Sequence, residues 1–352
     1  MKKILLLLVF IPIFSISQED KQNNSIKNQN LDFSNLSDGP YVFVEKNNLI
    51  EKRIINGEIS SKVLGKNTYD TIYYPEKSTF KKINTIAALS DIHGQYDLVI
   101  ELLINNEIID KNLNWIFGEG HLVIAGDVFD RGDKVNEVLW LIYNLEIQAK
   151  NSGGHVHFLL GNHEYMVLQK DLRYISDKYK LTSKLLKLDY DELYSKKTII
   201  GRWLRSKSTI IKINSNVFTH GGVSEEFISN NGSNFKRLNN KMRKYIDLPK
   251  NEIINDDIYN LYYGDKSLIW YRDYFQKYGD DLTDSDVSKI LRLVNSQHIV
   301  VGHCSQDHIV QLYNNKIFGI DSSIKNGKYG EILIIRDKQF FRATLNGNKT
   351  QF

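Results

Sequence analysis

Two aspartates and one arginine lie close together in residues 126–132, which read GDVFDRG. This segment directly follows the apolar run at residues 121–125, which has the pattern of a buried strand, and its two glycines favour a loop. In α/β folds, loops at the carboxyl ends of strands are where ligands bind. A carboxylate there suits a divalent cation, and an arginine suits a phosphate group. The segment therefore predicts a site that binds both.

Four further apolar runs lead into polar side chains of similar kinds. Each run is short and has the composition of a buried strand. The polar segments are residues 90–94, 161–164, 220–222 and 302–303, and they follow apolar runs at 83–89, 156–160, 217–219 and 299–301. Together with residues 126–132 they make five strand ends that deliver oxygen or imidazole ligands. One convergent metal centre is the most economical explanation.

The ligand types indicate both the metal and the reaction. Asp, His and Asn without cysteine favour a borderline-hard divalent ion, Mn first, with Fe or Zn as alternatives. A carboxylate can bridge two such ions at about 3.5–4 Å, and a water between them can become a hydroxide aimed in line at a bound phosphorus. A histidine oriented by a carboxylate can protonate the leaving oxygen, and arginine can bind the remaining phosphate oxygens. The sequence contains each of these parts.

The five segments resemble the motifs of the phosphoprotein phosphatases, a family of calcineurin-like metallophosphatases. The motifs are Asp91-Ile92-His93, residues 126–132, Gly161-Asn162-His163-Glu164, His220-Gly221-Gly222 and Gly302-His303. The resemblance covers residues 83–335, and the Asp-Arg-Gly ending of residues 126–132 distinguishes this family from the wider metallophosphodiesterases. Residues 268–272 and the terminal β-hairpin are similar to bacterial Shewanella-like phosphatases, some of which are exported and favour phosphotyrosine.

The resemblance implies two metal ions and a ligand set for each. One ion would be bound by Asp91, His93 and Asp127. The second would be bound by Asp127, Asn162, His220 and His303. Asp127 would therefore bridge the two ions.

The resemblance also implies the catalytic residues. His163 would be the general acid, oriented by Asp130, and Arg131 would bind the phosphate. Arg272, which lies in a variable insertion, would be a second phosphate ligand. Where the family commonly has a threonine after its Gly-His pair, this chain has Cys304, which we expect to be a small buried residue.

Strand and helix patterns alternate from residue 83 onward and predict an α/β catalytic domain at residues 81–352. By resemblance, its fold should be a four-layer α/β/β/α sandwich. Helical insertions at about 165–205 and 224–290 are long enough to wall a substrate cleft. Before this domain, Asn56-Gly57 between β-rich runs predicts a hairpin within a small antiparallel segment at residues 37–80.

The first 17 residues have the pattern of a secretory signal peptide, with a basic start, an apolar run and small residues before the polar stretch. The apolar run is shorter than the roughly 20 residues that span a bilayer. We therefore expect a periplasmic or secreted protein without a stable membrane span. Residues 18–36 are rich in Asn, Gln, Lys and Ser and predict a flexible tether.

The overall composition narrows the range of partners. A hydrophobic content of 41% is that of a globular protein. The formal net charge is +4 without a basic stripe that interleaves aromatic residues, so we expect no nucleic-acid partner. Cys304 is the only cysteine, which excludes an intramolecular disulfide.

Three functions remain open from the sequence. The first is an exported, metal-dependent phosphomonoesterase acting on phosphorylated proteins or peptides, at Tyr or at Ser/Thr. The second is a hydrolase of diadenosine polyphosphates or other nucleotides, as in the same family, and export argues against such a cytoplasmic substrate. The third is a module that binds a phosphorylated partner without catalysis. His163 and Asp130 argue against the third, because a binding module needs no proton donor.

Overall fold

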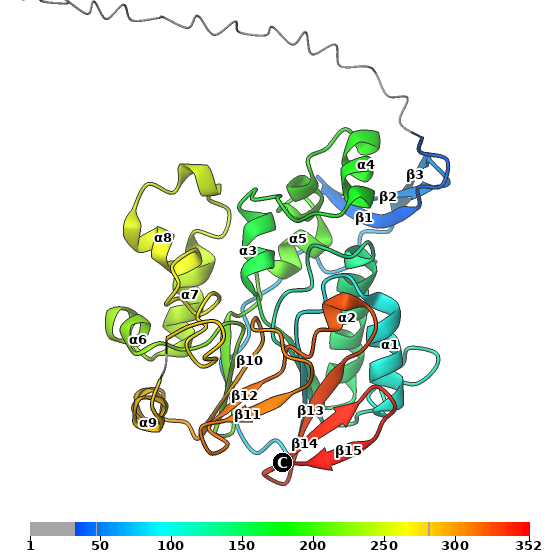
Figure 1. Ribbon diagram of the computed structural model, residues 1–352. Coiled ribbons are helices and arrows are strands. Elements are labelled where there is room, and N and C mark those ends of the chain that lie inside the picture. The colour runs from blue at the N-terminus through cyan, green and yellow to red at the C-terminus, as the bar shows by residue number, and fades with distance from the viewer. Residues whose placement is uncertain (1–31, 47, 281) are drawn as a thin grey trace, which may run out of the picture. The chain divides into compact units, whose positions relative to one another are not determined.

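Two six-stranded β-sheets lie at the centre of the fold (Figure 1). The structure is a computed structural model that describes residues 32–46, 48–280 and 282–352. The predicted signal peptide and most of the predicted tether lie outside these residues. In the part of the chain that is described, no helix is both long and apolar enough to cross a bilayer.

The first central sheet has the strand order β15-β14-β13-β5-β6-β7. Its strands are β5 (Thr85–Leu89), β6 (His121–Ile124), β7 (His155–Phe158), β13 (Glu331–Arg336), β14 (Gln339–Thr344) and β15 (Lys349–Gln351). β5, β6 and β7 are parallel, whereas β13, β14 and β15 pair antiparallel. The sequence predicts all of these strands except β15, which is short and polar.

The second central sheet has the order β11-β12-β10-β9-β8-β4. Its strands are β4 (Thr79–Phe80), β8 (Ile210–Ile213), β9 (Asn216–Thr219), β10 (His298–Val301), β11 (Val310–Leu312) and β12 (Ile317–Gly319). β9, β10 and β12 are parallel to one another, so their carboxyl ends lie at one edge of the sheet. The predicted positions of strands β9 and β10 are confirmed.

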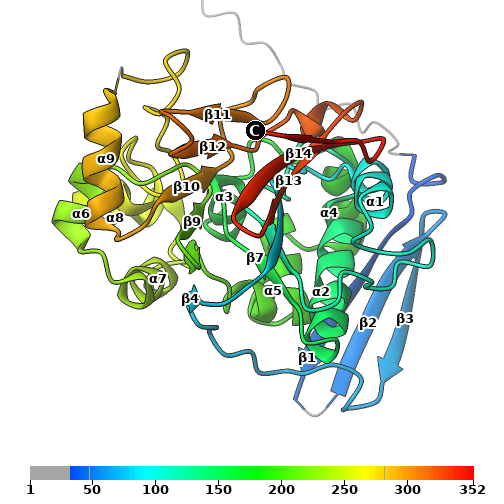
Figure 2. The same cartoon turned by 90° about the horizontal axis from the view of Figure 1, so that it is seen from below.

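The two sheets pack face to face, and helices cover their outer faces. Val123 of β6, Phe218 of β9, Val300 of β10 and Leu333 of β13 belong to one buried apolar cluster between the sheets. Figures 1 and 2 show α1 (Tyr96–Asn105) and α2 (Val135–Asn151) on one side of the sheets and α6 to α9 on the other. Because β5, β6, β9 and β10 are buried on both faces, they are largely apolar and do not alternate. The predicted α/β/β/α sandwich is confirmed.

The two long insertions are largely helical, as predicted. The first contains α3 (Asn162–Leu168), α4 (Asp177–Leu186), η1 (Tyr190–Tyr194) and α5 (Ile199–Leu204). The second contains α6 (Glu225–Asn231), α7 (Phe235–Lys244), η2 (Lys250–Glu252), α8 (Asp256–Tyr262) and α9 (Asp284–Leu293). Side chains of Ser224, Asn234, Asn255 and Thr283 accept backbone hydrogen bonds at the starts of α6 to α9, which explains where these helices begin.

A small antiparallel sheet precedes the core, with the order β1-β2-β3. Its strands are β1 (Asp38–Glu45), β2 (Asn48–Ile55) and β3 (Glu58–Leu64). Asn56 and Gly57 form the predicted turn, with φ of 49° and 80°. The sheet is shorter than the predicted segment, because the chain runs on irregularly after Leu64 until β4 joins a central sheet.

The small sheet is packed on the larger domain that contains the two central sheets. The indole Nε1 of Trp140 in α2 donates to the carbonyl of Pro40 at 2.9 Å, and Val44 N–H donates to Lys197 O at 2.7 Å. Leu36, at the end of the predicted tether, is buried, and its carbonyl accepts from Gly57 N–H. Phe33–Phe352 form one compact unit.

Candidate metal centre

The carboxyl ends of β5, β6, β7, β9 and β10 deliver the predicted metal ligands to one place. Asp127 Oδ2 lies 3.1 Å from His220 Nε2 and 3.7 Å from His93 Nε2. His220 Nε2 lies 2.9 Å from the side-chain oxygen of Asn162 and 3.2 Å from His303 Nδ1. Strands of both central sheets therefore contribute to a single cluster, which is the arrangement expected from the sequence.

Asp91, the remaining predicted ligand, reaches the cluster from the end of β5. Its Oδ2 accepts the backbone N–H of His303 at 2.9 Å, and its side chain is buried. Two groups of residues each bring three donor atoms within 4.8 Å of one another. One group is His93, Asp127 and His163, and the other is Asp127, His220 and His303. Asp127 belongs to both groups, which is the position expected of a bridging carboxylate.

The backbone holds several of these ligands in a conformation that only a fixed environment maintains. The φ angles of Asp91, His93, Asp127 and His303 are 53°, 45°, 59° and 65°, in the left-handed region. Residues with a Cβ adopt this region at a cost of about 1–3 kcal/mol each. The chain also approaches itself closely, because a Cβ at Gly161 would lie 2.3 Å from Asp127 Oδ1. Ligand placement is therefore built into the strand-end loops.

The predicted general acid and its predicted orienting carboxylate are in direct contact. His163 Nδ1 lies 2.5 Å from Asp130 Oδ2, and His163 Nε2 lies 3.8 Å from Asp127 Oδ2. Burial alone would lower the pKa of His163, but the charge of Asp127 and the hydrogen bond to Asp130 outweigh it. The pKa of His163 therefore lies above its usual value. A protonated imidazole at this position has a proton on Nε2 to donate.

The composition of the cluster fits divalent cations. Burial, followed by the charge of Asp321, raises the pKa of Asp91 to about 8. Burial acts in the same direction on Asp127, but the histidines, His220 first, outweigh it and hold the pKa of Asp127 well below its usual range. His303 Nε2 is buried and makes no hydrogen bond within the described residues. Buried carboxylates that need positive charge, together with an unused imidazole nitrogen, fit metal ligation.

Comparison with known proteins agrees with this geometry. The family model for the calcineurin-like phosphoesterases matches residues 85–319, a span that includes every predicted metal ligand. The chain belongs to the calcineurin-like phosphoesterase family. It is a metal-dependent phosphoesterase, as the sequence predicts.

Relatives of this calcineurin-like chain include named protein phosphatases. It is 28% identical over 273 residues to Shewanella-like protein phosphatase 1 of Plasmodium berghei, covering 74% of this chain and 73% of that protein. It is 24% identical over 295 residues to Shewanella-like protein phosphatase 2 of Arabidopsis thaliana, covering 71% and 74%. The crystal structure of a cold-active protein-tyrosine phosphatase from a psychrophilic Shewanella species matches with a TM-score of 0.85 at 38% identity, over 90% of this chain and 99% of that one. The predicted resemblance to Shewanella-like phosphatases is confirmed.

Glu164 holds two loops of the candidate metal centre in place, a role that the sequence analysis did not identify. Its buried carboxylate accepts the backbone N–H groups of Asp127, Val128, Phe129 and Gly161 at 2.7–3.2 Å. It thereby joins the loop after β6 to the loop after β7. The signal available in the sequence is its place three residues after Gly161 at a helix start, where a glutamate commonly closes a capping box.

Asp321 is a second residue that sequence reasoning missed. It follows β12, and its side chain is fully buried. Its Oδ2 accepts from Ser305 Oγ at 2.6 Å, and its charge acts on Asp91. The signal was present, because residues 317–320 are an apolar run that ends in a carboxylate, like the five runs identified from the sequence.

The predicted phosphate ligand Arg131 lies at the open side of the centre. Its side chain is exposed, and its Nε lies 3.3 Å from His93 Nε2. Its guanidinium lies 5.9 Å from the ring centroid of Tyr174, and that ring lies 5.4 Å from the ring of His163. Tyr174 therefore stands beside both the predicted general acid and the predicted phosphate ligand.

Arg272 approaches from the second insertion. Its guanidinium lies 5.4 Å from the ring of Trp270, which in turn lies 5.5 Å from the ring of His303. The segment is tied to the strand-end loop because Gly221 N–H donates to Leu268 O at 2.8 Å. Cys304 is buried, as expected, and burial raises the pKa of its thiol to about 12, so it is protonated.

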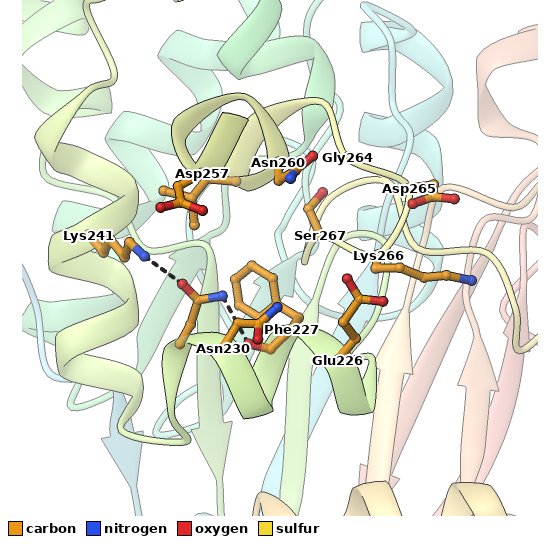
Figure 3. Close-up of a pocket in the computed structure, with 12 residues that line it drawn as sticks. Glu226, Phe227, Asn230, Lys241, Asp257, Asn260, Gly264, Asp265, Lys266 and Ser267 are labelled. Carbon is orange, nitrogen blue, oxygen red and sulfur yellow. Dashed lines mark hydrogen bonds between the residues drawn. The ribbon is translucent and has the colours of Figure 1, made fainter. Parts of the chain in front are cut away.

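A cavity of about 390 Å³ lies elsewhere in the second insertion (Figure 3). Glu226 of α6 and Asp257 of α8 are among its lining residues, and Lys241 of α7 donates to Asn231 Oδ1 at 2.6 Å. None of its lining residues is a predicted metal or phosphate ligand. The insertion therefore reaches the metal centre through residues 268–272 and not through this cavity.

Proposed function

We propose that this protein is an exported phosphatase that holds two divalent metal ions and hydrolyses phosphate monoesters on proteins or peptides, with phosphotyrosine preferred. The observation that carries the proposal is the position of Asp127. Its Oδ2 lies 3.1 Å from His220, 3.7 Å from His93 and 3.8 Å from His163. One carboxylate oxygen thus faces both donor groups and the predicted proton donor.

The ions would be held by the six predicted ligands, which are Asp91, His93, Asp127, Asn162, His220 and His303. Divalent ions bound there would neutralise phosphate charge and make an attacking water more acidic. Mn is the ion that we expect first, with Fe or Zn as alternatives, because the donors are carboxylate, imidazole and amide oxygen without thiolate.

His163, oriented by Asp130, would protonate the leaving group. Asp130 accepts Nδ1–H of His163, which fixes the ring and stabilises its protonated form. Nε2–H of His163 would then protonate the leaving oxygen as its bond to phosphorus breaks. Proton transfer by a positioned side chain contributes about 10²–10⁴-fold to a rate.

Arg131 would bind the phosphate oxygens that the ions leave free. Its exposed guanidinium offers a planar pair of donors that match two oxygens, and it stabilises charge that builds up on them. Arg272 would approach the phosphate from the other side, next to Trp270 and His303.

Two observations support a phosphotyrosine substrate. Tyr174 and Trp270 flank the centre and offer ring faces and edges to an aromatic ester, beside His163 and His303 respectively. A structural relative at 38% identity is named a protein-tyrosine phosphatase. The relatives from Plasmodium berghei and Arabidopsis thaliana are named protein phosphatases, which supports a protein substrate more generally.

The test is phosphate release from matched phosphotyrosine and phosphoserine peptides by the protein without residues 1–17, loaded with Mn. A dinucleoside polyphosphate is the third substrate, and Asp127→Asn is the control variant. We expect release that requires Asp127 and is fastest from phosphotyrosine. Turnover of the dinucleotide alone would favour the nucleotide hydrolase, and absence of turnover with metal bound would favour the binding module.

Export is tested separately. The full sequence is expressed in a Gram-negative host, and the protein recovered from periplasm and medium is sequenced from its N-terminus. We expect the chain outside the cytoplasm to begin at Gln18, because the small residues of the signal pattern end at Ser17. Protein that stays in the cytoplasm with residues 1–17 attached would refute export.

A further inference from the structure

Three histidines and one glutamate meet at the amino ends of the strands whose carboxyl ends form the metal centre. His121 is the first residue of β6, and His155 and His157 lie in β7. Glu76 comes from the irregular connection between β3 and β4. His121 and Asp127 are six positions apart, which corresponds to about 20 Å of extended chain, so this cluster is separate from the predicted catalytic ligands.

The four side chains contact one another in two pairs. Glu76 Oε2 lies 2.9 Å from His155 Nε2, and His157 Nε2 lies 2.9 Å from His121 Nδ1. Glu76, His155 and His157 each offer one ligand atom within 4.8 Å of the other two. The rings of His155 and His157 are stacked with centroids 4.3 Å apart.

The cluster lies at an unusual place for polar side chains, next to the apolar interior between the two sheets. His157 is directly opposite Val123 in the β6–β7 register, and Val123 is part of the apolar cluster between the sheets. Phe80 of β4 packs against the rings of His121, His155 and His157 at 4.5–5.6 Å. Imidazole side chains therefore occupy the rim of an interior that elsewhere is filled by apolar residues.

An ion can reach the cluster from solvent, and the negative charge of Glu76 suits a cation. His157 is 3% exposed, whereas the side chains of His155 and Glu76 are 22% and 29% exposed, so the open side faces solvent. Lys207 acts electrostatically on Glu76 and His157, but its ammonium is paired with Glu146 at 2.6 Å. Glu76 thus contributes a negative charge that an incoming cation would neutralise.

We propose that Glu76, His155, His157 and His121 form a zinc site that fastens the β3–β4 connection to the starts of β6 and β7. Zinc prefers four nitrogen, oxygen or sulfur ligands in a tetrahedron, and protein sites with four such ligands are structural. At Zn–ligand distances of about 2.0–2.1 Å, neighbouring ligand atoms lie about 3.3 Å apart. When zinc binds, the two 2.9 Å contacts would lengthen slightly and the longer distances between the other ligand atoms would shorten to reach that geometry.

The test is zinc content per chain, measured by mass spectrometry of the metal after the full protein is loaded with Zn²⁺ and desalted. His155→Ala and Glu76→Gln remove one ligand each at partly exposed positions. His298→Ala is the matched control, because His298 also begins a central strand, β10, and its Nδ1 contacts Asn315 O at 2.7 Å. Ions at the catalytic centre are common to all four proteins.

We expect the wild type and His298→Ala to retain one zinc more per chain than His155→Ala and Glu76→Gln. Zn²⁺ should also raise the Tm of the first two proteins by about 3 °C more than that of the others, since an ion that binds only the folded state stabilises it. Circular dichroism establishes that each variant is folded. Equal zinc content and equal Tm shifts in all four proteins would overturn the proposal and leave the cluster as a hydrogen-bonded network.

Discussion

His163 Nδ1 lies 2.5 Å from Asp130 Oδ2, in a buried pair that faces Asp127. This relationship fixes the ring of His163 and leaves its Nε2 directed at the space beside Asp127, 3.8 Å from Oδ2. The pair has the geometry of a proton donor and its orienting group. A role in protonating the leaving group can be separated from a role in folding by the choice of substrate.

The first prediction concerns His163→Asn and Asp130→Asn. We expect His163→Asn to lower kcat on phenyl phosphate by about 10²–10⁴-fold, because phenolate leaves poorly without a proton. On 2,4-dinitrophenyl phosphate, whose leaving group needs no proton, the loss should be about tenfold or less. Asp130→Asn should show the same dependence with smaller losses. Steady-state kinetics on both esters checks this, and equal losses on the two would show that neither residue assists proton transfer.

The second prediction concerns Glu164. Its carboxylate accepts four backbone N–H groups from two loops, and Glu164→Gln would turn an NH₂ toward some of these donors. We expect the free energy of unfolding to fall by about 2–4 kcal/mol, as for buried hydrogen bonds to a charged group. Urea denaturation measures this free energy of unfolding. We also expect the variant to lose bound metal, which its metal content measures.

Glu192→Gln is the matched control for Glu164→Gln. Glu192 also closes a capping box, accepting the backbone N–H of Asp189 at 2.9 Å, but this hydrogen bond is exposed to solvent. Its replacement should cost less than about 1 kcal/mol. Equal losses in the two variants would mean that Glu164 acts only as a helix cap and does not hold the loop of Asp127.

Most of the candidate metal centre could be predicted because its residues follow five strand ends. The apolar run before Asp127 and the glycines around it are local signals, and the carboxyl ends of parallel strands must meet at one sheet edge. Glu164 illustrates what such signals leave out. Its position at a helix start is visible in the sequence, but its contacts with Asp127 and Val128 bridge more than 30 residues.

Other features depend on tertiary contacts that no local pattern encodes. The β-rich N-terminal segment ends at Leu64. The residues that follow are irregular until Phe80, in β4, joins a central sheet. The strand β15 is polar, and its place is set by pairing with β14. His155 and His157 follow a period of two that is ordinary in a strand, and only the sheet brings them to His121 and Glu76.

The third prediction concerns the pH dependence of stability. Asp171 follows α3, and its carboxylate accepts from Arg173 at 2.6 and 2.8 Å and from Lys250 at 2.7 Å. Burial raises the pKa of Asp171, but these two cations outweigh it, so the folded-state pKa lies below the usual value. The stabilisation is therefore fully present above the ordinary aspartate pKa of about 3.9 and is lost as pH falls through the folded-state pKa.

Comparison with Asp171→Asn isolates this contribution. We expect the wild type to exceed the variant in free energy of unfolding by about 1 kcal/mol at pH 7 and pH 5, allowing for solvent screening, and the gap to narrow at pH 3.5. Urea denaturation at the three pH values measures it. Asp97→Asn, which removes an exposed pair with Lys134, should show no gap at pH 7. A gap for Asp171→Asn that widens toward pH 3.5 would contradict the assignment.

The fourth prediction separates two arginines that share one aromatic ring. The guanidinium groups of Arg131 and Arg173 lie 5.9 and 5.4 Å from the ring of Tyr174. Arg173 is paired with Asp171, whereas Arg131 lies beside His93 at the centre. If Arg131 binds the phosphate, only its loss should weaken binding of the substrate in the transition state.

We expect Arg131→Ala to lower kcat/KM on a phosphotyrosine peptide by about 10²-fold, and Arg131→Lys by about tenfold, because lysine keeps the charge but not the planar pair of donors. Arg173→Ala should stay within about twofold of the wild type, since its loss removes no group from the phosphate. Inhibition by inorganic phosphate gives a second readout that is independent of the chemical step, and its inhibition constant should rise only in the Arg131 variants. If Arg173→Ala instead matched Arg131→Ala in both measurements, the effect would belong to the position of Tyr174, and the phosphate would have to be held by Arg272 and the metal ions.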